Sequence, residues 1–305
     1  MSVLRSIRLA VLLLVIAAAG ASGTPPDQTV NAAYPGLATN ALVSARLTDL
    51  PSGLILRCGE VKVTQADLDG RLSQFDPQLR AKVKNDQFYL IEDAAAQSLL
   101  YSEAYDWSVK SKVSKASGEE LIAAYLATRT KNVTVPEPEI KRFYEENKDD
   151  MGGLSLREVK GDISKVMLDN KRREAVTAYT AALGNRYDIE VDKTWAAKQY
   201  PIAMDNPVEK ARKSGKPLLV DFGSTRCAPC RRLAPILDAL KKEYAGKLDM
   251  LVIDVDDEPI LGARYGAAVI PTQIFCDRTG KEVFRHTGFY SKANIVTKLA
   301  EIGVK

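Results

Sequence analysis

The chain has very little of two residue types that define whole classes of protein. Only one histidine, His286, stands among its 305 residues. Hydrolase chemistry built on a Ser–His or Cys–His pair therefore has little support, and we expect His286 to be an ordinary residue on or near a strand. Four cysteines are too few to build a disulfide scaffold in a chain of this length. We therefore expect each cysteine either to carry chemistry or to be incidental.

A clustered basic face is also missing. The net charge is +4, and Lys and Arg alternate with Asp and Glu along the chain. Because nucleic-acid binding needs clustered positive charge, no nucleic-acid partner is expected. Acidic residues cluster once, at Asp254, Asp256, Asp257 and Glu258. We interpret this cluster as a solvated loop before a helix rather than as a cation site.

Long apolar runs are absent except at the start of the chain. Arg5 and Arg8 precede an apolar stretch over 9–19, and small residues follow as far as Ala21. This pattern predicts a signal peptide, residues 1–21, and hence an exported, periplasmic protein that is soluble after cleavage. The apolar stretch is shorter than the roughly 20 residues that span a bilayer, and an uncleaved anchor is the alternative. In such a compartment disulfides form and persist.

Periodicity divides the remainder into a helical part and an α/β part. Residues 22–50 show little periodicity and are expected to be a flexible leader, and 51–192 to be an all-helical unit with a small hairpin. Residues 193–205 are expected to be a linker that packs on the second domain, 206–305. The predicted elements of the helical unit are two short strands over 53–57 and 60–63, a strand over 188–191, and helices after Thr64, over 86–107, after Ser117, over 136–147 and over 155–183.

The pattern changes in the last hundred residues. Short apolar strands over 218–222, 250–254 and 272–275 alternate with helical stretches. This alternation predicts crossover connections and an α/β fold with a mixed central sheet flanked by helices.

The motif Cys227-Ala228-Pro229-Cys230 follows the first of these strands and opens a helix. A helix N-terminus favours negative charge, so we expect Cys227 to be the thiolate nucleophile, with Arg226 lowering its pKa further. Cys230, one turn later and more buried, would resolve the mixed disulfide.

Two alternatives stay open for the cysteine pair: half of a zinc site, or an inert structural disulfide. The first lacks further ligands, because the remaining candidates, Cys58, Cys276 and His286, are scattered along the sequence. No metal is therefore expected. We expect Cys58 to be exposed in a hairpin turn and Cys276 to lie at the edge of the core; a disulfide of Cys58 with Cys276 or with a partner chain is the alternative.

These residues, together with Val220-Asp221-Phe222, Ile270-Pro271-Thr272 and Gly288, resemble the thioredoxin family in order and spacing. The resemblance covers roughly 205–305. It implies the thioredoxin fold, a redox-active Cys227–Cys230 disulfide and no cofactor. It also implies that Pro271 is cis beside the disulfide, and that Ile270, Pro271 and Thr272 bind the substrate chain, with the Ile270 backbone pairing with it. Finally, it implies that Asp221 is a buried carboxylate that relays a proton.

The chain departs from the family at several positions. Arg226 replaces the usual Trp, and Val252 replaces the Lys often paired with the buried Asp. Pro229, together with Arg226, is expected to tune the thiol pKa. The dipeptide Ala228-Pro229 lacks the His that strong oxidants carry. A reductase or isomerase is therefore favoured over a disulfide-forming oxidant.

The helical part resembles the SurA/parvulin-type exported chaperones. The resemblance rests on the segments 58–69, 135–147 and 157–173, and no isomerase domain fits between the last two. It implies a SurA-N-like domain that binds client polypeptides, and dimerisation is the alternative. The predicted partners are client proteins with disulfides or thiols and, for a reductase, a membrane electron-transfer partner. A holdase chaperone with the thioredoxin fold as scaffold is a second hypothesis.

Overall fold

The computed structural model describes residues 28–113, 117–148 and 151–305. The expected signal peptide lies outside them. Within these segments, no helix combines the length and the apolar character that crossing a bilayer requires. The chain divides into two compact units: residues 1–133 with 171–204, and residues 134–170 with 205–305.

The first unit contains a small mixed sheet of order β1-β4-β2-β3. The central strand β4 pairs in parallel with β1 and antiparallel with β2, and β2 forms the predicted hairpin with β3. The strands are β1 (Arg46–Thr48), β2 (Leu54–Cys58), β3 (Val61–Thr64) and β4 (Ile189–Asp192).

Helices make up most of the rest of the first unit. Side chains cap two of the predicted helices: Thr64 forms a capping box with Asp67, and the Ser117 side chain accepts a hydrogen bond from the N–H of Glu120. The helices are α2 (Val30–Ala33), α3 (Gln65–Leu72), α4 (Pro77–Val83), α5 (Gln87–Ser111), α6 (Gly118–Arg129), the end of α8 (Leu156–Gly184), α9 (Lys193–Met204) and a 3₁₀ turn, Lys84–Asp86.

Residues 28–50 are not the flexible leader that the sequence suggested. Several of their apolar side chains are buried, and those of Val30, Leu37 and Leu42 are fully so. The buried carboxylate of Glu92 on α5 accepts hydrogen bonds from the backbone N–H groups of Thr39, Asn40 and Leu42. Glu92, about fifty residues further along the chain, thus holds this segment in place, and the composition of the segment gives no sign of this contact.

The expected linker, 193–205, is mostly the helix α9. Its Trp195 ring stacks on Phe88 with 5.7 Å between ring centroids, and its indole N–H donates to Gln65 Oε1 at 2.8 Å. The segment therefore packs within the first unit, rather than on the second domain as expected, because the large aromatic ring finds an apolar partner there.

The second unit begins with a helical hairpin, α7 (Glu137–Asn147) and the start of α8. These helices bury a small apolar cluster of their own around Ile140, Tyr144, Val159 and Ile163. The single helical unit expected over 51–192 is thus divided between the two units.

The rest of the second unit is built on a mixed sheet of order β6-β5-β7-β8. β5 is parallel to β6 and antiparallel to β7, and β7 is antiparallel to β8. The strands are β5 (Leu218–Gly223), β6 (Asp249–Asp254), β7 (Thr272–Cys276) and β8 (Glu282–Thr287). The three strands predicted from the sequence are confirmed, and β8 adds a fourth.

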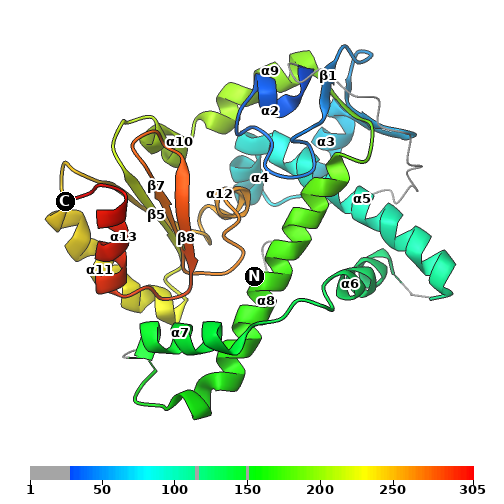
Figure 1. The fold of residues 1–305 in the computed structure, drawn as a ribbon. Helices are drawn as coiled ribbons and strands as arrows, with labels where there is room; N and C mark the ends of the chain where they lie inside the picture. Colours follow the sequence, from blue (N-terminus) through cyan, green and yellow to red (C-terminus); the bar gives the residue numbers. More distant parts are fainter. Residues whose placement is uncertain (1–27, 114–116, 149–150) are drawn as a thin grey trace. The chain divides into compact units, whose positions relative to one another are not determined.

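Helices cover both faces of this sheet (Figure 1). Leu233 of α11 (Ala228–Glu243) and Ile295 of α13 (Lys292–Glu301) pack on one face with Phe275. Val208 of α10 (Pro207–Arg212) and Leu261 of α12 (Pro259–Arg264) pack on the other. Every residue of β5 is buried, as a central strand covered on both faces requires.

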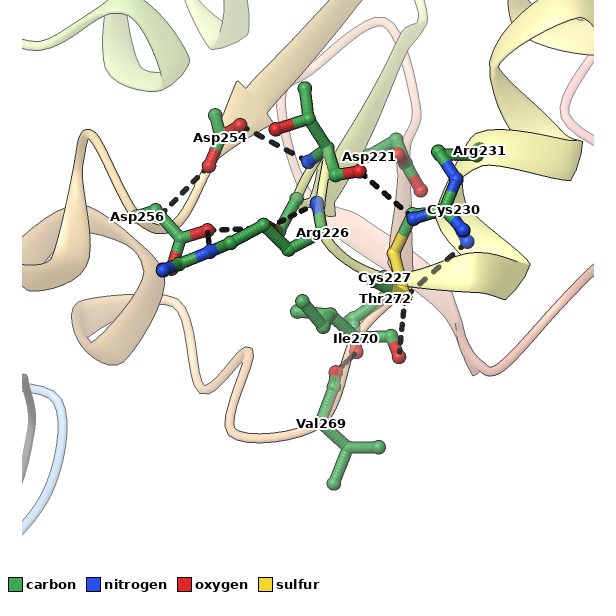
Figure 2. Close-up of a disulfide and its surroundings, with 12 residues drawn as sticks. Asp221, Arg226, Cys227, Cys230, Arg231, Asp254, Asp256, Val269, Ile270 and Thr272 are labelled. Carbon is green, nitrogen blue, oxygen red and sulfur yellow. Dashed lines mark hydrogen bonds and ion pairs between the residues drawn. A yellow bond between two sulfur atoms is a disulfide. The ribbon is translucent and has the colours of Figure 1, made fainter. Parts of the chain in front are cut away.

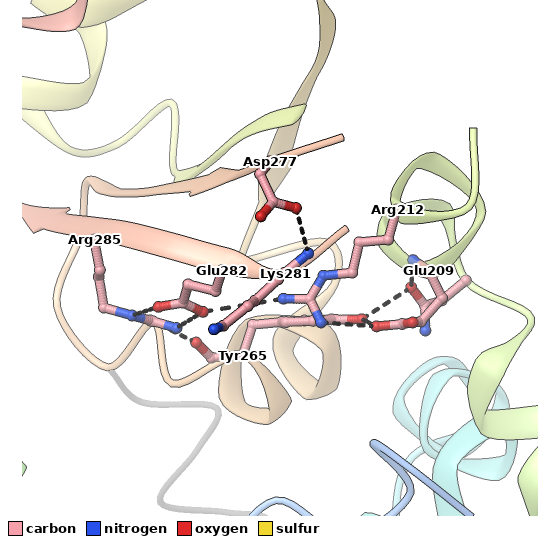
Figure 3. A network of polar contacts seen from close by, with 8 residues as sticks. Glu209, Arg212, Tyr265, Asp277, Lys281, Glu282 and Arg285 are labelled. Atoms are coloured by element: carbon pink, nitrogen blue, oxygen red, sulfur yellow. Dashed lines mark hydrogen bonds and ion pairs between the residues drawn. The ribbon is translucent and has the colours of Figure 1, made fainter. Parts of the chain in front are cut away.

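A polar network joins α10, the residue after α12 and β8 (Figure 3). The Tyr265 hydroxyl donates to Glu209 at 2.7 Å, and Arg212 donates to the same carboxylate at 3.3 Å. Arg285 donates to Glu282 at 2.8 Å and to the Tyr265 carbonyl at 2.7 Å. These contacts fix the helices against the β7–β8 hairpin.

Candidate active site

The two cysteines of the motif lie where the central strand β5 gives way to the helix α11. Cys227 is the N-cap residue of α11, and its sulfur accepts a hydrogen bond from the backbone N–H of Cys230 at 3.3 Å. Pro229 occupies the first turn, where its missing N–H costs no helical hydrogen bond. The Cys227 sulfur therefore sits at the positive end of the helix dipole.

The cysteines form a disulfide, with their Cα atoms 5.2 Å apart. The two sides of this bond differ in exposure: Cys227 is partly exposed, whereas Cys230 is buried. An incoming thiol or disulfide can therefore reach Cys227 more easily than Cys230.

The segment 269–272 lies beside the disulfide (Figure 2). The Ile270–Pro271 peptide bond is cis, and the Ile270 carbonyl oxygen lies 3.7 Å from the Cys227 sulfur. The Thr272 hydroxyl donates to the Val269 carbonyl at 2.6 Å and holds the turn. The structure thus brings together Cys227, Cys230, Ile270 and Pro271, four of the residues that the sequence singled out.

Arg226 points elsewhere than expected. Its guanidinium pairs with Asp256 at 2.5 Å, and in Figure 2 the side chain extends toward Asp256 and away from the disulfide. The Ser224 hydroxyl also donates to Asp256, and the hydrogen bonds from Arg226 and Ser224 lower the pKa of this carboxyl. Asp256, assigned to a solvated loop on sequence grounds, therefore offsets the positive charge beside Cys227.

Asp221 lies in the middle of β5 and is almost fully buried. Burial raises its pKa to about 6, and a hydrogen bond from Gln273 Nε2, at 2.7 Å, acts in the opposite direction. A Cβ atom at position 223 would lie 3.3 Å from Asp221 Oδ2 and 3.5 Å from the Cys230 sulfur. Oδ2 and this sulfur therefore border the same narrow space, which Gly223 leaves open.

The remaining cysteines and the histidine lie elsewhere in the fold. Cys58, expected to be exposed in a turn, is buried at the end of β2, and burial raises its pKa to about 12. Cys276 is buried in β7, and neither thiol forms a disulfide in the described part of the chain. The His286 ring stacks on Tyr290, 4.2 Å away, and burial lowers its pKa.

Sequence reasoning missed two residues of the site, Asp256 and Gln273. Gln273 could have been found from strand pairing, since it stands two residues after Pro271 on a strand that pairs with the Asp221 strand. No local signal marked Asp256. Over the described ranges, no group of three His, Cys, Asp or Glu side chains is arranged to hold a metal ion.

Comparison with known sequences agrees with this geometry. The sequence profile of the family named Thioredoxin matches residues 201–301. The thioredoxins of several Staphylococcus aureus strains are 42% identical over 81 residues, which cover 27% of this chain and 77% of each relative. The crystal structure of a thioredoxin from Nicotiana alata is 29% identical and covers 31% of this chain and 79% of its own, with a TM-score of 0.28. The resemblance of the helical part to SurA-type chaperones stays a prediction.

Three observations point to the same family. The disulfide lies at the start of a helix, a cis proline lies beside it, and the relatives share most of their length with this chain. The chain belongs to the thioredoxin family, and its C-terminal region is a thiol–disulfide oxidoreductase domain.

Proposed function

We propose that the protein is an exported oxidoreductase that reduces or reshuffles disulfides of client proteins, with Cys227 as nucleophile and Cys230 as resolving thiol. The observation that carries this proposal is the asymmetry of the pair. The sulfur at the helix N-terminus is partly exposed, and its partner is buried one turn further on. Such an arrangement lets one sulfur meet the substrate and reserves the other for the intramolecular step.

The reaction takes place in two exchanges. The Cys227 thiolate attacks one sulfur of the client disulfide, and the other client sulfur leaves as a thiolate. Asp221 then accepts the proton of Cys230, and the Cys230 thiolate attacks the Cys227 sulfur. The second client sulfur leaves, so the client gains two electrons and the enzyme is left with the Cys227–Cys230 disulfide.

The client chain docks beside the disulfide through the backbone of Ile270, next to the cis Pro271 and Thr272. The position of the Ile270 carbonyl, 3.7 Å from the Cys227 sulfur, supports this assignment. Main-chain pairing of this kind is independent of the client sequence, so it suits an enzyme with many clients.

The direction of electron flow is proposed to be reductive. Ala228-Pro229 supplies no histidine cation to stabilise the thiolate, and Arg226 is paired with Asp256. A reduction potential near about −270 mV supports a reductant, and one near about −120 mV identifies a disulfide-forming oxidant instead. Measuring the potential of the Cys227–Cys230 pair against glutathione decides between them.

The helical part is proposed to bind client polypeptides, with dimerisation as the alternative. Support comes from apolar side chains that α5 leaves exposed at Tyr105 and Val109. Such surface attracts extended chains. If Tyr105→Ser and Val109→Ser lower the affinity for a reduced, unfolded client and leave the sedimentation coefficient unchanged, client binding is supported; a change in sedimentation coefficient alone supports dimerisation.

Export rests on the predicted signal peptide. A periplasmic reductase needs electrons from across the membrane, so a membrane dithiol protein is the proposed partner. Fractionation of cells that express the full chain tests this: recovery in the periplasm without the first 21 residues is expected, whereas retention in the membrane favours the uncleaved anchor.

Insulin reduction tests the enzymatic assignment directly. Cys227→Ser should lose essentially all activity, and Cys276→Ala, which removes a buried thiol outside the site, should keep it. If wild type has no reductase activity, and both it and Cys227→Ser suppress client aggregation equally, the holdase hypothesis replaces the enzyme.

A further inference from the structure

The strands on either side of Asp221 place very different side chains next to its carboxyl group. Residue 252 of β6 is its parallel neighbour, and this residue is Val. Residue 273 of β7 is its antiparallel neighbour, and this residue is Gln. Directly paired residues present their side chains on the same face of a sheet. Asp221 therefore has an amide, and not a cation, as its cross-strand partner.

Gln273 is fully buried, and its amide group is only half used. Its Nε2 donates to Asp221 Oδ1 at 2.7 Å, whereas its Oε1 has no hydrogen-bond partner among the described residues. A buried acceptor without a partner lowers stability, so such groups are rare in proteins. The unpartnered Oε1 of Gln273 therefore needs an explanation.

The change in protonation of Asp221 explains why Gln273 has an unpartnered oxygen. An ionised carboxyl group has acceptors alone, so when Asp221 is ionised, Nε2 of Gln273 is a suitable donor to it. When Asp221 is protonated, its O–H needs an acceptor, and a half-turn of the amide brings Oε1 to the place of Nε2. A lysine could serve only the ionised form, because it has donors alone.

We propose that Gln273 is a positioning residue that holds the Asp221 carboxyl group in both of its protonation states and keeps Oδ2 facing Cys230. The inference rests on the proposed function, since it concerns the group that accepts the Cys230 proton. The groups around Asp221 are few: Cys230 of α11 borders the same space, β7 contributes Gln273, and β6 contributes Val252. Burial and the Gln273 hydrogen bond are the two causes that shift the pKa of Asp221.

The pH dependence of client reduction by the reduced full-length protein tests the inference. In wild type the rate of the second exchange, followed in a single turnover, should rise with pH around 6, as Asp221 ionises. Gln273→Met keeps the length of the side chain and removes both polar atoms. Because a hydrogen bond to a charged group is stronger than one to a neutral group, the rise should move upward by about one pH unit. Activity should then fall about fivefold at pH 6 and change little at pH 8.

Gln273→Glu is the matched second variant, with the same shape and an added carboxyl group. It should move the rise upward further, because two neighbouring carboxyl groups resist a second ionisation. In an Asp221→Asn background, Gln273→Met should have no further effect on the profile. A purely structural role for Gln273 would lower activity at every pH and in both backgrounds, and would overturn the proposal.

Two further outcomes separate this inference from the proposed function. If both Gln273 variants keep the wild-type profile while Cys227→Ser is inactive, the inference is wrong and the oxidoreductase assignment stands. If Cys227→Ser keeps its activity, the assignment itself fails. Wild type alone gives a check that no folding defect can obscure: by NMR, the Gln273 amide protons should titrate with the same midpoint as the Asp221 carboxyl carbon. Amide resonances that do not move with pH would contradict the proposal.

Discussion

A carboxyl group is almost fully buried in each of the two units, Glu92 in the first and Asp221 in the second, and the two sites use it differently. Glu92 of the first unit accepts hydrogen bonds from three backbone N–H groups and the Thr39 hydroxyl. Asp221 of the second unit accepts one, from Gln273. Burial raises the pKa of both groups. The number of donors differs: several fixed donors hold Glu92, as suits a structural anchor, whereas the single donor to Asp221 is compatible with the proton exchange proposed for it.

Replacing Glu92 should have the largest effect. Glu92→Gln turns an amide NH₂ group toward backbone donors that need acceptors, and it should lower the free energy of unfolding of the first unit by about 3 kcal/mol. Urea denaturation followed by the fluorescence of Trp195, which belongs to the same unit, measures this change. The reduction potential of the Cys227–Cys230 pair should stay the same. An unchanged unfolding midpoint would contradict the role of Glu92 as an anchor.

Replacing Asp221 should have the opposite effect on stability. Its folded pKa of about 6 lies above the ordinary value of about 3.9, so its ionisation lowers stability progressively as pH rises from 4 to 6. Asp221→Asn should therefore raise the free energy of unfolding at pH 7 by about 2 kcal/mol, and should bring no gain at pH 4. The same variant should slow client reduction at pH 7. If stability falls at pH 7, Asp221 is a structural group like Glu92.

Val252 occupies the strand position paired with Asp221, where a cation can be introduced. Val252→Lys puts an ammonium group on the strand position paired with Asp221 and should lower the pKa of that carboxyl by about one unit. The rise of the pH–rate profile should move downward accordingly. Combined with Gln273→Met, it should bring the profile back near that of wild type. Val283→Lys, on the exposed part of β8, is the control and should leave the profile in place.

The smallest effect is expected from Asp256. Asp256→Asn removes the partner of Arg226, so the guanidinium charge acts more strongly on Cys227. The pKa of the Cys227 thiol should fall by roughly a few tenths of a unit, because the arginine side chain is largely exposed and solvent screens it. The pH dependence of iodoacetamide alkylation of the reduced protein measures this shift. A rise in this pKa would mean that Asp256 acts in another way.

The sequence alone was enough to predict the C-terminal fold and the position of the cysteine pair and the proline beside it. A buried strand, a CxxC motif and a proline before a further strand are local patterns, and each stands where it was expected. The partners of Arg226 and Asp221 were not predicted. Asp256 and Gln273 lie 30 and 52 residues away from them, and strand register rather than any local pattern brings them close.

The same limit explains the errors in the first unit. Residues 28–50 have the composition of a loop, yet Glu92 orders them from another element. The segment 193–205 was expected to be a linker because it lies between two sequence patterns, yet Trp195 packs on Phe88. Long-range contacts decide both cases, and periodicity carries no information about them.

The burial of Cys58 and Cys276 has a practical consequence for measuring the redox state of this protein in cells. Both thiols are shielded, and burial raises the pKa of each, so a native-state thiol reagent should spare them. The label taken up by the folded protein then counts only the open form of the Cys227–Cys230 pair. A single mass measurement on a rapidly quenched sample should therefore give the fraction of molecules ready to donate electrons.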